Sequence, residues 1–229
     1  MVADEKRFLR QIYGEWRDLL GSVLPTGSGA VLELGAGDRW MPPVTAVSIR
    51  TDVRPLRGLS LVADARCLPI RDASLRLIGM TDVFHHIPDV KNFLYEAERA
   101  LRPGGVVAMV EPWNTGWSRF IYSNFHHEPF CPEAREWPFP PGDPMLAANG
   151  ALPWMVFERD RERFERDYPG LRIERVEPFM PLRYLLSGGL TFPSLQPGWM
   201  FPFWTRVERA LGPVSRGCAM FAFIVLRRV

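Results

Sequence analysis

All four histidines of this chain occur as two adjacent pairs. The first pair is His85-His86, and the second is His126-His127, which Glu128 follows directly. Imidazole titrates near neutral pH and can accept the proton of a hydroxyl group, so both pairs are candidates for one shared active site. In the alternative interpretation, a ring of each pair only packs or caps a turn. Adjacent histidines lack the helical i, i+4 spacing of metal-ligand pairs, so we expect no metal site.

A glycine-rich turn follows an apolar segment nearer the N-terminus. The sequence ELGAG of residues 33–37 places glycines where a backbone can turn sharply and let a ligand approach without a Cβ atom in the way. A dinucleotide fingerprint, GxGxxG, would require a third glycine at position 40, which is Trp40. This departure argues against a nicotinamide-dependent oxidoreductase, which is kept only as an alternative.

The elements that must position these groups alternate between apolar strands and helices. We expect an amphipathic helix from Asp4 to about Leu20 that ends at Gly21, strands at residues 30–34, 44–50, 59–62, 77–80 and 106–110, and a helix at residues 90–101. Such alternation predicts an α/β fold with a parallel sheet and right-handed connections. Ligands of open α/β sheets bind beyond the carboxyl ends of the strands, so residues 81–86 are expected at the site.

Five ordered features between residues 31 and 110 resemble the motifs of class I S-adenosylmethionine-dependent methyltransferases. They are the pattern Glu33-x-Gly35-x-Gly37, the acid Asp52 after the second strand, the segment DARCLPIRDAS at 64–74, the segment DVFHHIPD at 82–89, and the segment LRPGG at 101–105. Their joint order and spacing identify the chain as similar to the type 11 methyltransferases of the small-molecule group.

The resemblance implies a fold, a cofactor and a cofactor-binding set. The implied fold is a Rossmann-like seven-stranded sheet of order 3-2-1-4-5-7-6, in which strand 7, expected at residues 218–226, is antiparallel. The implied cofactor is S-adenosylmethionine, with S-adenosylhomocysteine as product. Asp52 would accept hydrogen bonds from the ribose hydroxyls, and Asp64 from the adenine amino group. The expected cofactor-binding residues are Glu33, Gly35, Ala36, Gly37, Asp52, Val53, Asp64, Ala65 and Thr81.

The cofactor loop departs from the family pattern. The family often has a third glycine where this chain has Arg39, and the prolines at positions 42 and 43 forbid a regular helix directly after the loop. Arg39 or Arg10 is therefore a candidate to supply the positive charge that a helix N-terminus would offer the methionine carboxylate. A non-catalytic scaffold or binding protein with a degenerate loop is the alternative to an enzyme.

Aromatic residues and prolines concentrate after the fifth expected strand. Residues 112–204 hold 19 of the 28 aromatic residues, so we expect a cap there rather than further strand–helix repeats. Within this region the pattern predicts a charged helix at 156–168 and a strand at 171–176. The rings would cover an apolar acceptor, form the cap's own core or form a subunit interface. The expected substrate-pocket residues are Trp113, Trp117, His126 and His127.

Composition and charge exclude several other classes of protein. A net charge of +2 is too weak to indicate a nucleic-acid partner. The longest apolar stretch, residues 219–226, is far shorter than the roughly 18–20 residues that span a bilayer, and the first residues lack a signal-peptide pattern. We therefore expect a cytoplasmic protein without stable membrane insertion. Three widely spaced cysteines predict reduced thiols and no structural zinc.

We expect a single methyltransferase domain over residues 1–229. It comprises an N-terminal helical segment (1–29), a cofactor-binding core (30–111), a cap insertion (112–170) and C-terminal strands (171–229) with a second cap segment (179–212). The expected activity is methyl transfer to a small-molecule acceptor held under the aromatic cap. O-methylation is favoured because the catalytic candidates His85 and His86 are available as bases. A homodimer is left open.

Overall fold

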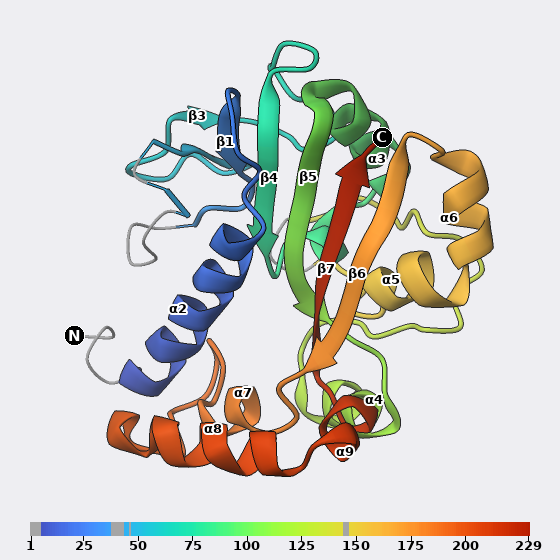
Figure 1. Cartoon of the computed structure of the whole chain (residues 1–229). Coiled ribbons are helices and arrows are strands. Elements are labelled where there is room, and N and C mark those ends of the chain that lie inside the picture. Colours follow the sequence, from blue (N-terminus) through green and yellow to red (C-terminus); the bar gives the residue numbers. More distant parts are fainter. Residues whose placement is uncertain (1–5, 38–43, 46, 144–146) are drawn as a thin grey trace.

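The computed structural model describes residues 6–37, 44–45, 47–143 and 147–229. Its centre is a seven-stranded sheet in the order β3-β2-β1-β4-β5-β7-β6 (Figure 1). The strands are β1 (Ala30–Glu33), β2 (Ile49–Asp52), β3 (Leu61–Val62), β4 (Leu75–Thr81), β5 (Leu101–Pro112), β6 (Leu171–Phe179) and β7 (Phe221–Arg228). Strand β7 pairs antiparallel with both β5 and β6, and the other neighbours are parallel. The expected fold class, strand order and strand 7 direction are confirmed.

Helices flank the sheet and gather at one of its ends. They are α2 (Arg7–Ser22), the 3-10 turn η1 (Phe84–His86), α3 (Val90–Ala100), α4 (Gly116–Phe125), α5 (Leu152–Trp154), the π-helical turn η2 (Met155–Arg159), α6 (Arg161–Asp167), α7 (Arg183–Leu186), the 3-10 turn η3 (Gly198–Met200), α8 (Phe201–Ala210) and α9 (Pro213–Gly217). In Figure 1, α4, α7, α8 and α9 lie beyond the end of the sheet where the arrows of β4 and β5 finish.

Two apolar layers hold the sheet, one on each face. On one face, Phe8, Ile12 and Trp16 recur every four residues along α2 and are buried against the sheet with Phe221. On the other face, helix α3 packs with η1 and the segment from α5 to α6. The central strands are therefore covered on both sides, which explains why their sequences are almost continuously apolar.

Several expected elements have different bounds in the structure, and strand ends differ by up to five residues, as where β5 begins at Leu101 instead of position 106. The strand expected at 44–50 forms later, at β2, because the Ser48 hydroxyl accepts from the Thr45 N–H and closes a turn before it. The helix expected at 156–168 divides into η2 and α6. Helix α2 continues through Gly21 to Ser22, and the expected start at Asp4 lies outside the described residues.

Only part of the cap insertion lies over the end of the sheet. The segment from α5 to α6 packs beside the sheet instead, with Trp137, Phe157 and Phe164 buried in the α3-side layer. The three cysteines are free thiols. Within the described part of the chain, no helix is both long enough and apolar enough to cross a membrane.

Candidate active site

A cavity of about 1010 Å³ lies beyond the carboxyl ends of β1, β2 and β4. Of the expected cofactor residues, those that line it are Gly35, Gly37, Asp52, Val53, Asp64, Ala65 and Thr81. All four histidines line it as well. The cavity therefore joins the glycine loop and both histidine pairs, which lie up to 92 positions apart in the chain.

Gly35 sits at a point where no side chain fits. Its φ angle is +60°, in the region that favours glycine, and a Cβ atom there would overlap the side chain of Val83. Gly37 also has a positive φ, +58°, and its N–H donates to the carboxylate of Asp52 at 3.3 Å. The loop after β1 is thus pressed against the segment after β4 and tied to the end of β2.

The two expected acids have different surroundings. Asp52 is buried and lines the cavity, and its carboxylate accepts the backbone N–H groups of Gly37 and Arg54 and, at 3.3 Å, Nε–H of the Arg54 side chain. Asp64 is half-buried and held by the guanidinium of Arg66, whose Nη2 lies 2.6 Å from Oδ2. The hydrogen bond from Arg66 lowers the pKa of Asp64 below its ordinary value.

Glu33 and Ala36 lie behind the glycine loop and line a smaller hollow there. The Glu33 carboxylate accepts the N–H of Val44 and lies 3.7 Å from Nε of Arg50. Arg50 in turn donates to the Ala36 carbonyl at 2.8 Å. These contacts brace the loop from behind.

The two arginines expected near the methionine carboxylate are not both described. Arg10 is exposed on α2, and Arg39 lies outside the described residues, as do the residues at 40–43.

The turn that carries the first histidine pair is held by Glu111, which the sequence analysis did not single out. Glu111 lies at the end of β5 with no exposed surface. Its Oε1 accepts the N–H groups of Val83 and Phe84 at 2.9 and 2.8 Å, and its Oε2 accepts Nδ1–H of His85 at 2.7 Å. The sequence did contain a signal for this residue, because Glu111 directly follows the apolar run 106–110. A carboxylate buried at the end of such a strand requires hydrogen-bond partners.

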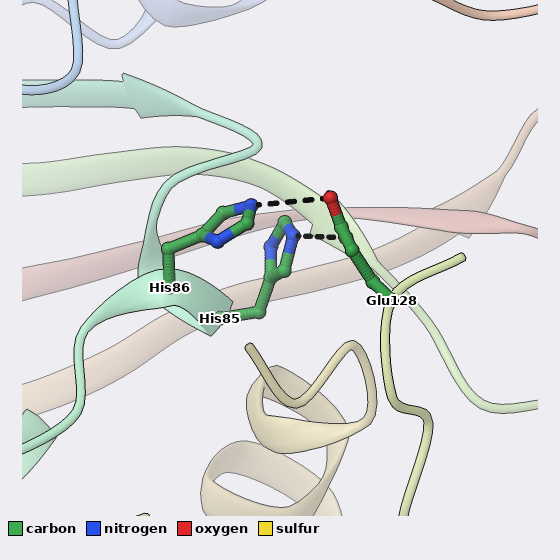
Figure 2. Close-up of side chains that lie close together, drawn as sticks. All are labelled: His85, His86 and Glu128. Atoms are coloured by element: carbon green, nitrogen blue, oxygen red, sulfur yellow. Dashed lines mark ion pairs between the residues drawn. The ribbon is translucent and has the colours of Figure 1, made fainter. Parts of the chain in front are cut away.

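Glu128 lies across both rings of the first pair (Figure 2). Its Oε2 is 3.3 Å from Nε2 of His85, and its Oε1 is 3.5 Å from Nε2 of His86. Nδ1 of His86 donates to the carbonyl of Ala147 at 3.2 Å. Figure 2 shows the two rings entering from η1 and the carboxylate entering from the segment that follows α4.

The second histidine pair flanks the same carboxylate. Nδ1 of His126 lies 3.8 Å from Oε2 of Glu128, and Nε2 of His127 lies 3.6 Å from Oε1. Both rings are more exposed than those of His85 and His86. The structure thus brings both expected pairs to one acid, Glu128.

Charges in this cluster shift the pKa values of its members. Burial opposes the charged form of His85, but its hydrogen bond to Glu111 and the nearby carboxylate of Glu128 outweigh burial and raise the pKa of His85 to about 10. Burial likewise opposes ionisation of Glu128, yet the His85 and His86 contacts hold its pKa well below the ordinary range. Burial lowers the pKa of His126. His85 and Glu128 therefore form an ion pair at neutral pH.

Asp82 and Tyr13 form a second polar group on the cavity wall. The Tyr13 hydroxyl donates to Oδ2 of Asp82 at 3.2 Å. Burial raises the pKa of Asp82 to about 7. Asp82 also has a φ of +54°, a left-handed conformation that is costly for a residue with a side chain. The sequence did not indicate Tyr13 as a site residue, because its position next to Ile12 on α2 is typical of the apolar face of that helix.

Trp113 and Trp117 were expected to line the pocket, but neither lies in the cavity wall. Trp113 is buried in the α3-side apolar layer, and the indole N–H of Trp117 donates to the carbonyl of Pro181 at 2.9 Å. The aromatic residues that do line the cavity from the two cap segments are Tyr122, Phe125, Phe130, Tyr184 and Phe192.

Residues 27–109 match the Methyltransf_11 family, a methyltransferase domain. A curated relative, the 27-O-demethylrifamycin SV methyltransferase of Amycolatopsis mediterranei, is 28% identical over 131 residues, which is 46% of this chain and 47% of that protein. The chain thus matches about half the length of that relative.

Two solved structures are similar in fold. The first is a SAM-dependent methyltransferase of Thermotoga maritima, with a TM-score of 0.58 and 15% sequence identity. The match covers 98% of this chain and 91% of that one.

The second structure is the geranyl diphosphate C-methyltransferase of Streptomyces coelicolor, in complex with Mg²⁺, geranyl diphosphate and S-adenosyl-L-homocysteine. Its TM-score is 0.52 at 14% identity, and the match covers 94% of this chain and 80% of that one. At this level of identity, both structures establish the fold alone.

Proposed function

We propose that this chain, which belongs by fold and by its matched domain to the class I S-adenosylmethionine-dependent methyltransferases, transfers a methyl group from S-adenosylmethionine to a small-molecule acceptor. The observation that carries the proposal is the common cavity, which has cofactor-motif residues at one end and the histidine–glutamate cluster at the other. Its volume of about 1010 Å³ is at the upper end of the roughly 300–1,000 Å³ typical of ligand pockets, which favours room for two ligands.

The cofactor end has features that fit S-adenosylmethionine. Gly35 and Gly37 keep the backbone open to a ligand, and the buried carboxylate of Asp52, which lines the cavity, would accept hydrogen bonds from the ribose hydroxyls. Val53, Asp64 and Ala65 line the adjacent wall and would hold the adenine. When bound, S-adenosylmethionine supplies an electrophilic methyl group on its sulfonium for an in-line displacement.

At the acceptor end, the chain's own residues would orient the acceptor and exclude water. Tyr122, Phe125 and Phe130 provide apolar walls, which favour a partly apolar molecule. Among these walls, His85, His86 and Glu128 form the polar group that would meet the acceptor. His85 is protonated in its ion pair with Glu128, so the base candidate is His86, whose Nδ1 donates to the Ala147 carbonyl and whose Nε2 can accept the proton of a hydroxyl. An O-methyl acceptor is therefore favoured. The rifamycin methyltransferase named above is a relative whose acceptor is also a small molecule.

The cofactor half of the proposal is tested by calorimetric titration of ligand-free protein with S-adenosylhomocysteine. Wild type should bind it, and Asp52→Ala should weaken binding by about 10- to 100-fold. This loss corresponds to the free energy of about 1.5–3 kcal/mol that a hydrogen bond to a charged group contributes. Asp72→Ala is the matched control, because Asp72 is exposed and outside the cavity. Binding that is equal in wild type and Asp52→Ala would contradict the assigned site.

The transfer half is tested with labelled S-adenosylmethionine and a panel of hydroxylated, amino and carbon acceptors of partly apolar character. We expect label in a hydroxyl-bearing acceptor. A folded, ligand-free wild type that binds no S-adenosylhomocysteine would overturn the enzymatic proposal and favour a scaffold with a degenerate loop.

A further inference from the structure

We infer that His85, His86 and Glu128 form a binding site for one divalent transition-metal ion. One ligand atom from each residue, a ring nitrogen of each histidine and a carboxylate oxygen of Glu128, can be chosen so that all lie within 4.8 Å of one another. Two imidazoles and one carboxylate are a donor set used by Zn²⁺ and Fe²⁺ sites that keep positions open for a substrate. Ion binding itself is independent of the proposed function, and only the role of the ion in methyl transfer rests on it.

The distances within the cluster suit ligands around an ion better than direct hydrogen bonds. A charge-assisted N–H···O⁻ bond is about 2.7–2.9 Å long. Glu128 lies 3.3 Å from Nε2 of His85 and 3.5 Å from Nε2 of His86. Atoms that bind one ion at about 2.0–2.2 Å are separated from one another by about 3.0–3.5 Å.

The far sides of both rings have the partners that metal-binding histidines require. Nδ1–H of His85 donates to the buried carboxylate of Glu111 at 2.7 Å, and Nδ1–H of His86 donates to the carbonyl of Ala147 at 3.2 Å. Such contacts fix the ring orientation and leave Nε2 as the atom directed at the metal. The ion would bind Nε2 of His85 in place of the proton that this atom carries in the metal-free protein, and that proton would be released to solvent. Both rings are therefore held with Nε2 toward the same carboxylate, as Figure 2 shows.

The tertiary structure removes the reason for expecting no metal. Adjacent histidines on a regular helix point in different directions, but His85 and His86 lie on the 3-10 turn η1, where their ring centroids are 4.3 Å apart. The third donor, Glu128, comes from the cap insertion 42 positions after His86.

The cluster opens toward the cavity. His85 is nearly inaccessible, whereas the side chains of Glu128 and His86 retain 14% and 18% exposure. Three protein ligands leave at least one coordination position for an oxygen of the acceptor. An ion there would bind the acceptor hydroxyl and lower its pKa, so that its proton would pass to water in the cavity. The resulting alkoxide or phenolate oxygen would form a bond to the methyl carbon as the bond from that carbon to the sulfonium sulfur breaks, which leaves S-adenosylhomocysteine.

The test is a titration of chelator-treated, untagged protein with Co²⁺, followed by its visible absorption, and with Zn²⁺ by calorimetry. We expect one ion per chain. His86→Ala and Glu128→Gln should each weaken binding by about 100-fold or more, and Glu111→Gln by about 10- to 100-fold. The matched control is His127→Ala, since His127 also approaches Glu128 but is outside the ligand group. It should keep the wild-type affinity.

Two further controls make the result decisive. The exposed thiols of Cys67 and Cys131 are replaced by serine, because thiolates bind Co²⁺ with a distinct absorption. S-adenosylhomocysteine affinity is measured for every variant, so that a variant with an intact cofactor end is known to be folded. His86→Gln is the second variant if His86→Ala does not fold.

Each outcome decides between the two proposals. Wild type that binds S-adenosylhomocysteine but no ion would overturn the metal site and leave the proposed function standing. Ion binding that persists in both His86→Ala and Glu128→Gln would also overturn the metal site. Ion binding lost in both variants supports the site, whether or not methyl transfer is detected. A loss of transfer after chelation, restored by the ion, would support its role in the reaction.

Discussion

Oε2 of Glu111 lies 2.7 Å from Nδ1 of His85, and the other oxygen of the same carboxylate accepts the N–H groups of Val83 and Phe84. One buried acid at the end of β5 thus fixes both the backbone of the turn after β4 and the orientation of its first ring. Because Glu128 contacts the opposite side of that ring, the orientation of the candidate active site depends on Glu111.

Glu111→Gln should destabilise the protein by about 3 kcal/mol, because it leaves the buried, cationic His85 with one charged partner fewer. The measurement is equilibrium unfolding in urea. Glu174→Gln is the matched control, since Glu174 pairs with Arg227 at the surface and should change the free energy of unfolding by less than about 1 kcal/mol. Equal losses in the two variants would show that the Glu111 contacts are not structurally important.

Gly35→Ala should weaken S-adenosylhomocysteine binding by about tenfold or more, because it costs about 1–3 kcal/mol of strain at positive φ and collides with Val83. Adding Val83→Ala should recover part of the loss, since it relieves the collision but not the strain. Gly14→Ala is the control: a Cβ there meets open space on α2, so affinity should be unchanged and stability raised by up to about 1 kcal/mol. Wild-type affinity in Gly35→Ala would contradict the assigned loop.

Asp82→Asn should alter the pH dependence of stability. The raised pKa of Asp82, about 7 against an ordinary 3.8, means that the folded state binds the proton more tightly, so this group's contribution is complete below about pH 4 and is lost as the pH rises through 7. The groups that act on it are Tyr13, His85, Glu111 and Glu128. The loss amounts to at most about 4 kcal/mol, at about 1.4 kcal/mol per pKa unit.

The measurement for Asp82 compares urea unfolding of wild type and Asp82→Asn at about pH 5 and about pH 8. The variant cannot ionise at this position, so its stability relative to wild type should rise at the higher pH. A difference between the two proteins that does not change with pH would contradict the burial of an ionisable Asp82.

Glu208→Gln should loosen the packing of α7 against α8 within the second cap segment. Arg183 is buried and pairs with Glu208 at 2.5 Å and with Glu15 of α2 at 2.7 Å, while Glu208 also accepts the N–H of Leu182. Loss of one partner of this buried cation should cost about 3 kcal/mol in unfolding free energy. It should also speed proteolysis within residues 188–197, measured by mass spectrometry. The exposed pair partner Glu165, changed to Gln, is the control and should have neither effect.

The sequence by itself determined the main elements of the core and predicted the edge of the sheet at which the candidate site lies. Apolar runs and helical spacing are local properties, so β1, β4, α3 and the apolar face of α2 were recognisable from periodicity. The strand order was implied by the resemblance of the ordered motifs to a known family. The glycine loop was also readable, because positive φ angles at Gly35 and Gly37 are a local requirement of the backbone.

Only the tertiary structure decided which side chains meet. Glu111 and Glu128 lie 26 and 43 positions from His85, and no local pattern indicates that both carboxylates contact its ring. Trp113 was expected in the pocket but is buried in the apolar layer, because an aromatic side chain suits a wall or a core equally well and only packing decides between them. The arrangement of this candidate site therefore depends on contacts between residues far apart in the sequence, one from the end of β5 and one from the segment after α4.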